Sequence, residues 1–342
     1  MDSMDLDDIS LDPALLAALP TGCEILSIWS TGLRIDVAVG DEEKSFFAKL
    51  IEREEFVGMA EAEYEGQKAI SAVIPEHAVE PIAWGYYEGD RTKAWFLTHF
   101  RNLVPRPPPL SSFLPVVKKL HQESVSPTGK FGFHVTPFYG PPPMIVSWTD
   151  NWEKFWTREF RSGLEYVQRM RGEDPELAEI AEEFIDKVVP RLLRPLQTGG
   201  RNIKPSLCHG DLWDGNIQID WDTKKPMVFD PCPFYGHCEM DLQCMRSPRY
   251  VVGLDFVKEY SKGVGKSEPI EDFDDRNALY AIRNDIMTAG MWPQWAHLIE
   301  KAKEEMLRLL DKHPNGLAGF KGDLTPTVTT KADHVAVIEA KL

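Results

Sequence analysis

Apolar and polar residues alternate in short runs through the first 100 residues of the chain. Alternation with a period of two places apolar side chains on one face of a strand, and it predicts strands over 24–29, 33–39, 45–50, 82–87 and 94–100. Turns at 40–42 and 88–90 would join neighbouring strands as hairpins. One run with helical spacing, 56–72, interrupts the series. This part of the chain therefore predicts an antiparallel sheet with one inserted helix.

Helical spacing dominates after a proline-rich break at 105–109, where we place a lobe boundary. Helices are predicted over 114–121, 148–171, 175–193, 274–291 and 295–311. Residues 125–147 are rich in Pro, Gly and aromatic side chains and predict an ordered loop. The expected organisation is an acidic arm with a short helix (1–20), a sheet lobe (21–103), a helical lobe (104–320) and a partly disordered tail (321–342).

The composition narrows the class of protein. The 342 residues are 43% hydrophobic, enough to bury a sizeable core, and 54 acidic against 38 basic residues give a net charge of −16. Nucleic acids and anionic membranes attract basic surfaces, so neither is expected as a main partner. The first residues contain no apolar run, and no stretch approaches the ~18 apolar residues of a membrane span. We expect a cytoplasmic protein.

The cysteines do not predict a disulfide framework or a zinc site. There are five, an odd and sparse set in a long chain, which is typical of thiols: Cys23, Cys208, Cys232, Cys238 and Cys244. Three of them lie near His237, but their spacing is wider than the usual pairing of zinc ligands.

The most informative segment is 207–216, followed by a short apolar run that ends at Asp230. Phosphoryl transfer from a nucleotide needs a carboxylate to take the acceptor's proton, and metal ions to neutralise the phosphates. Such ions prefer Asp and Asn oxygens. Asp211 and Asn216 have the D-x₄-N spacing of a kinase catalytic loop, and Asp230 has the place of a second metal-binding Asp. The segment predicts a phosphotransferase.

A simpler interpretation is that Asp211 and Asn216 are turn formers beside Gly210 and Gly215. A lone D-x₄-N is weak evidence because both residues are common. The combination with His209 and a later Asp at the end of a strand is far less expected by chance, so we favour the catalytic interpretation.

A kinase also needs a cation for the phosphates and an acid that holds this cation in place. Lys49 lies on the third predicted strand, where such a lysine belongs, and Glu63 in the following helix could pair with it. Glu61 and Glu65 are rivals that the sequence alone does not separate. A surface lysine and a solvated acidic helix face are the alternative.

The glycine-rich loop that covers phosphates in kinases is reduced here. The expected place, 27–34, contains only Gly32 and no G-x-G-x-x-G. A second glycine-rich segment, 263–267, resembles a P-loop, but that pattern needs glycine where Tyr260 stands.

The motifs together resemble the fructosamine (ketosamine) 3-kinase family, which is similar to the aminoglycoside and choline phosphotransferases. The resemblance covers about residues 20–320 and is most specific in the second lobe. It rests on His209-Gly210-Asp211-Leu212-Trp213-x-Gly215-Asn216, Asp230-Pro231, Phe234-Tyr235-Gly236-His237, Leu120-His121, Gly129-Lys130-Phe131-Gly132-Phe133 and the tryptophans Trp148 and Trp152. Segments 190–196 and 271–276 resemble the fungal branch of the family.

The resemblance implies an α+β, two-lobed, protein-kinase-like fold and ATP-dependent phosphorylation of the sugar 3-hydroxyl of ketosamines. ATP and magnesium would be the cofactors, and a sugar-amine or glycated protein the acceptor; we expect a monomer or a weak homodimer. The resemblance implies that Asp211 is the base, that Asn216 and Asp230 bind magnesium, and that Lys49 binds phosphate with Glu63 as its partner. It also implies that Gly32 belongs to the phosphate loop, that Thr98, His99 and Phe100 form the hinge at adenine, and that Trp213 and Asp214 contact the sugar. Two further residues, His209 and Asp241, would brace the structure.

Departures from the family pattern lie near the acceptor side. Cys232 and Pro233 replace smaller residues, and Asp214 stands where many members carry Ser or Tyr. Two alternatives therefore stay open: a kinase of the same fold with another acceptor, such as an aminosugar or a secondary metabolite, and a nucleotide-binding pseudokinase.

Overall fold

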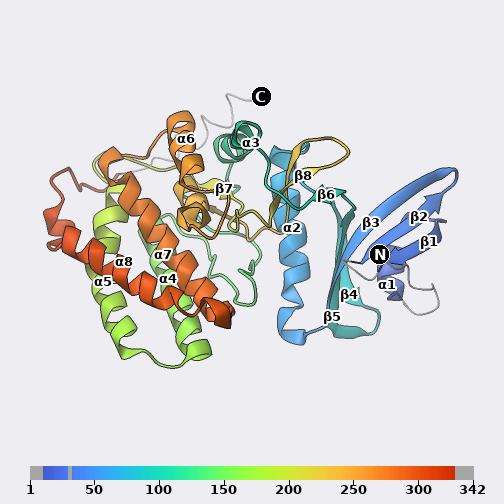
Figure 1. Cartoon of the computed structure of the whole chain (residues 1–342), viewed down its shortest axis with the longest axis horizontal. Coiled ribbons are helices and arrows are strands. Elements are labelled where there is room, and N and C mark those ends of the chain that lie inside the picture. Colours follow the sequence, from blue (N-terminus) through green and yellow to red (C-terminus); the bar gives the residue numbers. More distant parts are fainter. Residues whose placement is uncertain (1–10, 30–32, 328–342) are drawn as a thin grey trace. The chain divides into compact units, whose positions relative to one another are not determined.

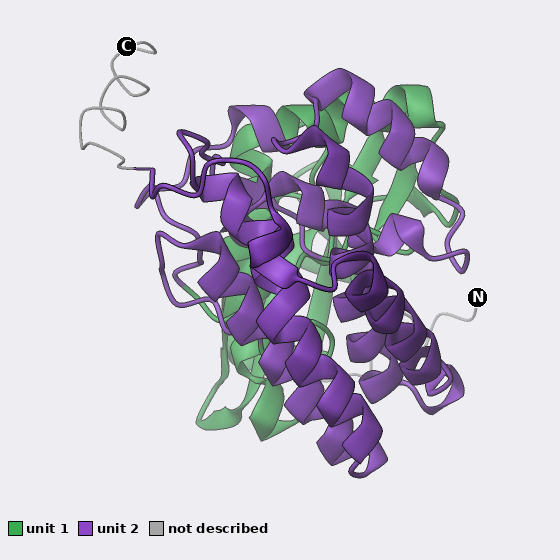
Figure 2. Ribbon diagram, turned by 90° about the vertical axis from the view of Figure 1, so that its left-hand side faces the viewer, with its two compact units in different colours: residues 1–120, 135–143, 211–233 green, residues 121–134, 144–210, 234–342 purple. Residues whose placement is uncertain are grey.

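The computed structural model describes residues 11–29 and 33–327. It divides into two compact units, each assembled from separate stretches of the chain (Figure 2). Unit 1 comprises residues 1–120, 135–143 and 211–233, and unit 2 comprises 121–134, 144–210 and 234–342. The first half of the predicted acidic arm, Gly32 and most of the predicted tail lie outside the described residues.

Unit 1 is built on a five-stranded antiparallel sheet, as the alternating pattern predicts. The strands are β1 (Glu24–Trp29), β2 (Arg34–Val39), β3 (Glu42–Ile51), β4 (Pro81–Tyr87) and β5 (Asp90–His99). Their order is β1-β2-β3-β5-β4 (Figure 1). Strands β3 and β5 begin earlier than predicted, at charged residues, because the tight turns before them let the cross-strand ladder continue to Val39↔Glu42 and Tyr87↔Asp90.

The two faces of this sheet have separate apolar clusters. Successive residues of a strand point to opposite faces, so in β5 Leu97 joins one cluster and Phe96 the other. The helix α1 (Pro13–Ala17) covers the first face, with Leu15 fully buried. The helix α2 (Gly58–Val73) supplies Ala60 to the second cluster and lies beside the sheet in Figure 1. Both helices lie where the sequence predicts them.

A small sheet brings a segment distant in sequence into unit 1. Its strands are β6 (Leu103–Val104), β8 (Ile217–Asp220) and β9 (Pro226–Val228), in the order β6-β8-β9. The Asp220 carboxylate closes the β8–β9 turn by accepting the backbone N–H of Asp222 and Thr223. The Val228 N–H donates to the His77 carbonyl at 2.8 Å. The bond to His77 attaches β9, the strand before Asp230, to the segment between α2 and β4.

Unit 2 is mainly helical, as predicted. Its helices are α4 (Trp152–Arg171), α5 (Pro175–Leu193), α6 (Leu254–Val264), α7 (Phe273–Met291) and α8 (Leu298–Lys312), and its strands are β7 (Ser206–Cys208) and β10 (Phe234–Gly236). Helix α4 begins later than predicted because Asn151 caps it, accepting the Lys154 N–H. Helix α6 was not predicted. Helix α3 (Leu110–Glu123) starts earlier than predicted and passes from unit 1 into unit 2.

Short 3₁₀ helices complete the two units: Glu54–Phe56, Arg194–Gln197, Cys238–Arg246, Ile270–Asp272, Pro293–Trp295 and Gly316–Gly319. Residues 125–147 form an irregular segment with isolated bridges, in agreement with the predicted loop. Within the described ranges, no helix is both long and apolar enough to cross a membrane.

Candidate active site

Lys49 lies on β3 and points toward the sheet face that α2 covers. Its Nζ is 2.7 Å from Glu63 Oε2 on α2. The structure thereby separates the three candidate acids, because Glu63 is the one that pairs with the lysine. The Glu63 side chain is 12% exposed and that of Lys49 is 36% exposed, so the acid is mostly buried while the lysine stays partly open to solvent.

Asp230 completes an ion-pair triad with these two residues. Its Oδ1 is 2.8 Å from Lys49 Nζ, although 181 positions separate the residues in sequence. The backbone of Asp230 has φ +56°, a left-handed conformation that non-glycine residues adopt rarely and Asp tolerates better than most. This strained position lies two residues after the end of β9. The Asp230 side chain is 51% exposed, so its carboxylate is open to a ligand.

Asn216 connects the two aspartates of the motif. Its Nδ2 donates to Asp211 Oδ2 at 2.9 Å, to the Asp211 carbonyl at 2.9 Å and to the Asp230 carbonyl at 3.3 Å. These acceptors assign the amide orientation, because a flipped amide would place oxygen against oxygen. The Nδ2 atom makes these hydrogen bonds, so Oδ1 is the atom of this amide that could bind a cation.

The loop between Asp211 and Asn216 depends on a glycine. A Cβ atom added to Gly215 would lie 2.4 Å from the Trp213 ring, so the ring packs directly on the glycine backbone. Trp213 is 36% exposed and Asp214 is half-buried beside it. The structure thus brings both predicted sugar-contacting residues into the same loop as Asp211.

The crowding of carboxylates changes their proton affinity. Burial raises the pKa of Asp211 to about 7, and the Asp230 charge adds to this effect, while hydrogen bonds from Trp213, Tyr139 and Asn216 oppose it. Burial likewise raises the pKa of Glu63 to about 7 in spite of the lysine. Burial alone would lower the pKa of Lys49, but the adjacent acids hold it above its usual range. The lysine remains charged at neutral pH.

A cavity of about 270 Å³ lies next to this triad. It is lined by Phe47, Glu63, Gln67, Val79, Phe96, Thr98, His99, Phe100, Arg101, Leu103, Phe229 and Asp230. The lining combines a mostly apolar wall with a few polar groups, as is typical of a small-molecule site. All of these residues belong to unit 1.

The predicted hinge, Thr98 to Phe100, lies at this cavity, but part of its backbone is already bonded. The N–H groups of His99 and Phe100 donate to the carbonyls of Glu80 and Ser45. Thr98 Oγ1 donates to the His99 carbonyl at 2.8 Å. The guanidinium of Arg34 lies over the Phe100 ring, 4.4 Å from its centre. The sequence analysis did not predict that Arg34 packs on Phe100 or that Gln67 lines the cavity. Gln67 lies one helical turn after Glu63, and this spacing could have indicated that it lies on the same face of α2.

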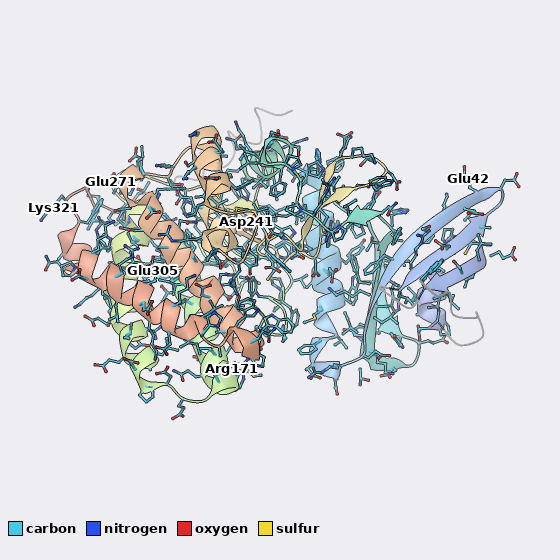
Figure 3. All side chains as sticks on the ribbon, viewed as in Figure 1. Glu42, Arg171, Asp241, Glu271, Glu305 and Lys321 are labelled. Carbon is cyan, nitrogen blue, oxygen red and sulfur yellow. The ribbon has the colours of Figure 1, made fainter. Side chains whose placement is uncertain are left out.

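The residues just before Asp211 are held within unit 2. Asp241 accepts the backbone N–H of His209 at 2.8 Å and of Gly210 at 2.7 Å. His121 Nε2 is 2.9 Å from the same carboxylate, and its Nδ1 is 2.6 Å from the Tyr260 hydroxyl. Burial would raise the pKa of Asp241, but the His121 bond and the backbone N–H groups hold it below its usual range. Figure 3 labels Asp241 in the interior of its unit. This geometry is that of a structural brace.

The sheet with its inserted helix, the mainly helical remainder and the Lys–Glu pair define a kinase-like fold. A solved structure described as a fructosamine-3-kinase from Thermobifida fusca superposes with a TM-score of 0.68 at 19% identity, covering 87% of this chain and 100% of that one. An aminoglycoside phosphotransferase, APH(4)-Ia, in a ternary complex with AMP-PNP and hygromycin B, superposes with a TM-score of 0.52 at 12% identity, covering 89% and 98%. These likenesses establish the fold.

Sequence comparison gives the family. The family model described as fructosamine kinase matches residues 28–310, so the chain belongs to the fructosamine kinase family. A mouse ketosamine-3-kinase is 37% identical over 33% of this chain and 34% of its own length. A chloroplastic protein-ribulosamine 3-kinase of Oryza sativa subsp. indica is 30% identical over 48% of this chain and 46% of its own. The chain thus spans about a third to a half of the length of these relatives.

Proposed function

We propose that the protein is an ATP- and magnesium-dependent kinase that phosphorylates the 3-hydroxyl of ketosamines, such as fructosamine and ribulosamine adducts of proteins or small amines. The observation that carries the proposal is the convergence of Lys49, Glu63, Asp230, Asn216 and Asp211 in one compact unit. Membership of the fructosamine kinase family supports the choice of a sugar-amine acceptor.

Asp211 is the proposed base. The acceptor hydroxyl oxygen attacks the γ-phosphorus of ATP, the bond from that phosphorus to the bridging oxygen of ADP breaks, and the hydroxyl proton passes to Asp211. A sugar hydroxyl has a pKa far above 7, so the proton moves late and positioning supplies most of the catalysis. The Asn216 amide, which donates to Asp211 Oδ2, fixes the orientation of this carboxylate.

The donor atoms around the motif fit a divalent cation. Asn216 Oδ1 and the half-exposed Asp230 carboxylate are hard oxygen ligands of the kind that magnesium prefers. A bound magnesium ion neutralises phosphate charge during transfer. The Asp230 carboxylate contacts Lys49 here, so a cation at Asp230 would compete with this ion pair and leave the ammonium to face the phosphates.

Lys49 also supplies positive charge for nucleotide binding in this proposal. The net charge of −16 repels an anionic ligand at long range. Local positive potential must therefore come from Lys49 and bound metal. The partner Glu63 holds the lysine toward the cavity and is itself shielded from solvent.

The first test is transfer of labelled phosphate from ATP to fructosyl-lysine and to a ribose-derived ketosamine, with and without magnesium. We expect magnesium-dependent transfer by the wild-type protein. Asp211→Asn should lower kcat by about 10²–10⁴-fold, the range for loss of a general base. A matched control is Asp222→Asn, which changes an exposed turn residue of the same unit and should retain activity.

Three results would overturn this proposal in different ways. ATP binding without transfer to any ketosamine would indicate another acceptor within the same fold. An Asp211→Asn variant as active as Asp222→Asn would exclude Asp211 as the base. A protein that binds no nucleotide, with or without magnesium, would not be a kinase.

A further inference from the structure

One short segment, 135–143, belongs to unit 1 although the chain on both sides of it belongs to unit 2. The Tyr139 N–H closes a turn within this segment by donating to the Pro142 carbonyl at 3.0 Å. The Phe138 ring packs at the start of α2, 3.4 Å from the place that a Cβ on Gly58 would take. The segment thus carries Tyr139, a residue only 3% exposed, into the unit that holds the candidate site.

The Tyr139 hydroxyl donates a hydrogen bond to the Asp211 carboxylate, the proposed base. Two further donors reach the same carboxylate: the Asn216 amide, at 2.9 Å, and the Trp213 indole. Both of these residues lie in the same loop as Asp211, whereas Tyr139 comes from a segment much earlier in the chain. Tyr139 therefore holds the carboxylate from outside its own loop.

These three donors leave the carboxylate with room for a substrate hydroxyl. An ionised carboxylate has about four lone-pair sites, so about one remains for an acceptor that approaches from solvent. Asp211 is half-buried, which lets a substrate reach it. A base must point at the proton that it takes, and a misplacement of about 1 Å can cost about 10²-fold in rate. Loss of the Tyr139 donor would free the carboxylate to turn.

We propose that Tyr139 is a positioning residue for the phosphoryl transfer: its hydroxyl, by donating to Asp211, fixes the orientation in which this carboxylate meets the acceptor hydroxyl. This inference rests on the proposed function, because it takes Asp211 as the base. Tyr139 transfers no proton itself and, being buried, does not bind the acceptor. Its effect on the reaction therefore passes entirely through Asp211.

The test is a double-mutant cycle on phosphate transfer from ATP, with magnesium, to fructosyl-lysine or the ribose-derived ketosamine. Tyr139→Phe keeps the ring and removes the hydroxyl. We expect kcat to fall about 10–100-fold, the effect of losing a hydrogen bond to a charged group, with KM for ATP and acceptor within about twofold of the wild type. In the Asp211→Asn background the same substitution should change kcat less than about twofold, because an asparagine takes no proton and its orientation no longer matters.

Tyr86→Phe is the matched control, because it removes the same atom from a half-buried tyrosine on β4 of the same unit and should keep kcat. Tyr139→Met serves as a second variant if Tyr139→Phe does not fold. An unchanged kcat in Tyr139→Phe, or an equal loss with and without Asp211, would overturn this inference and leave the proposed function intact. A wild-type protein that transfers phosphate to neither ketosamine would overturn both.

Discussion

At the scale of single residues, the site keeps several carboxylates together at an energetic cost. Asp211 and Glu63 both have pKa values raised to about 7 by burial, and Asp230 adds its own charge. Perturbed acids of this kind are concentrated at functional sites. Burying these acids together costs the free protein stability, and the proposed function supplies a reason for keeping them there.

The raised pKa of Asp211 predicts how stability depends on pH. Its ordinary value is 3.8, so between about pH 4 and pH 7 the folded protein holds a proton that the unfolded chain releases. The stability that this group contributes is fully present below its unfolded-state pKa of 3.8, and it is lost as the pH rises through its folded-state pKa of about 7. Asp211→Asn removes the loss, so the variant should gain more in Tm at about pH 8 than at about pH 6. Thermal unfolding at both values measures this.

The matched control is again Asp222→Asn, whose side chain is exposed. It should change Tm equally little at both pH values. If Asp211→Asn gains the same Tm at both pH values, the carboxyl of Asp211 in the wild-type protein has a pKa near its ordinary value.

At the scale of elements, α2 is the part on which the site depends. Glu63, Gly66 and Gln67 lie on one face of this helix, at spacings of three and four residues. A Cβ on Gly66 would lie 2.5 Å from Pro233 Cγ, so only glycine lets the segment after Asp230 approach the helix. This close approach positions Glu63 and Asp230 around the lysine.

Gly66→Ala should therefore destabilise the protein and weaken nucleotide binding. Alanine is the better helix former by about 1 kcal/mol, but overpacking against Pro233 costs about 1–3 kcal/mol. The measurements are the urea unfolding midpoint and the dissociation constant for ATP with magnesium. Gly58→Ala is the control in the same helix, because its Cβ would meet Phe138 at an ordinary 3.4 Å. Equal effects of the two substitutions would contradict the role given to Gly66.

At the scale of the whole molecule, the chain carries many charges, and some are fully buried in unit 2. Arg276 donates to both oxygens of Glu239, at 2.7 and 3.0 Å, and both side chains are at most 1% exposed. Arg276 also donates to the carbonyls of Ser267 and Pro269. A buried pair of this kind contributes little over an apolar pair, but removing one partner leaves an uncompensated charge.

Glu239→Gln should consequently lower the free energy of unfolding by about 3–5 kcal/mol, a loss that urea denaturation can measure. Glu271→Gln is the control, because Glu271 is exposed and Figure 3 labels it at the periphery of its unit. That substitution should stay within about 0.5 kcal/mol of the wild type. A small effect of Glu239→Gln would mean that water or rearrangement compensates Arg276.

Much of the fold could be predicted from local patterns. The sheet with its inserted helix and the long helices of unit 2 follow from the periods of two and 3.6, which depend on near neighbours. Errors occur where non-local or capping interactions decide. Helix α4 starts at Trp152 because Asn151 caps it, and β3 is longer than predicted because its turn continues the ladder. Helix α6 was missed.

The sequence by itself determined the family, and it predicted the residue types of the candidate site, because Asp211, Asn216 and Asp230 lie at short, specific spacings. Tertiary structure decided which groups meet. It chose Glu63 over its neighbours, and it placed Asp230 against a lysine 181 positions away. It also left an oxygen of Gln67 without a donor among the described residues. Motif spacing reports only local order, whereas ion pairs and unpaired atoms depend on how distant segments pack.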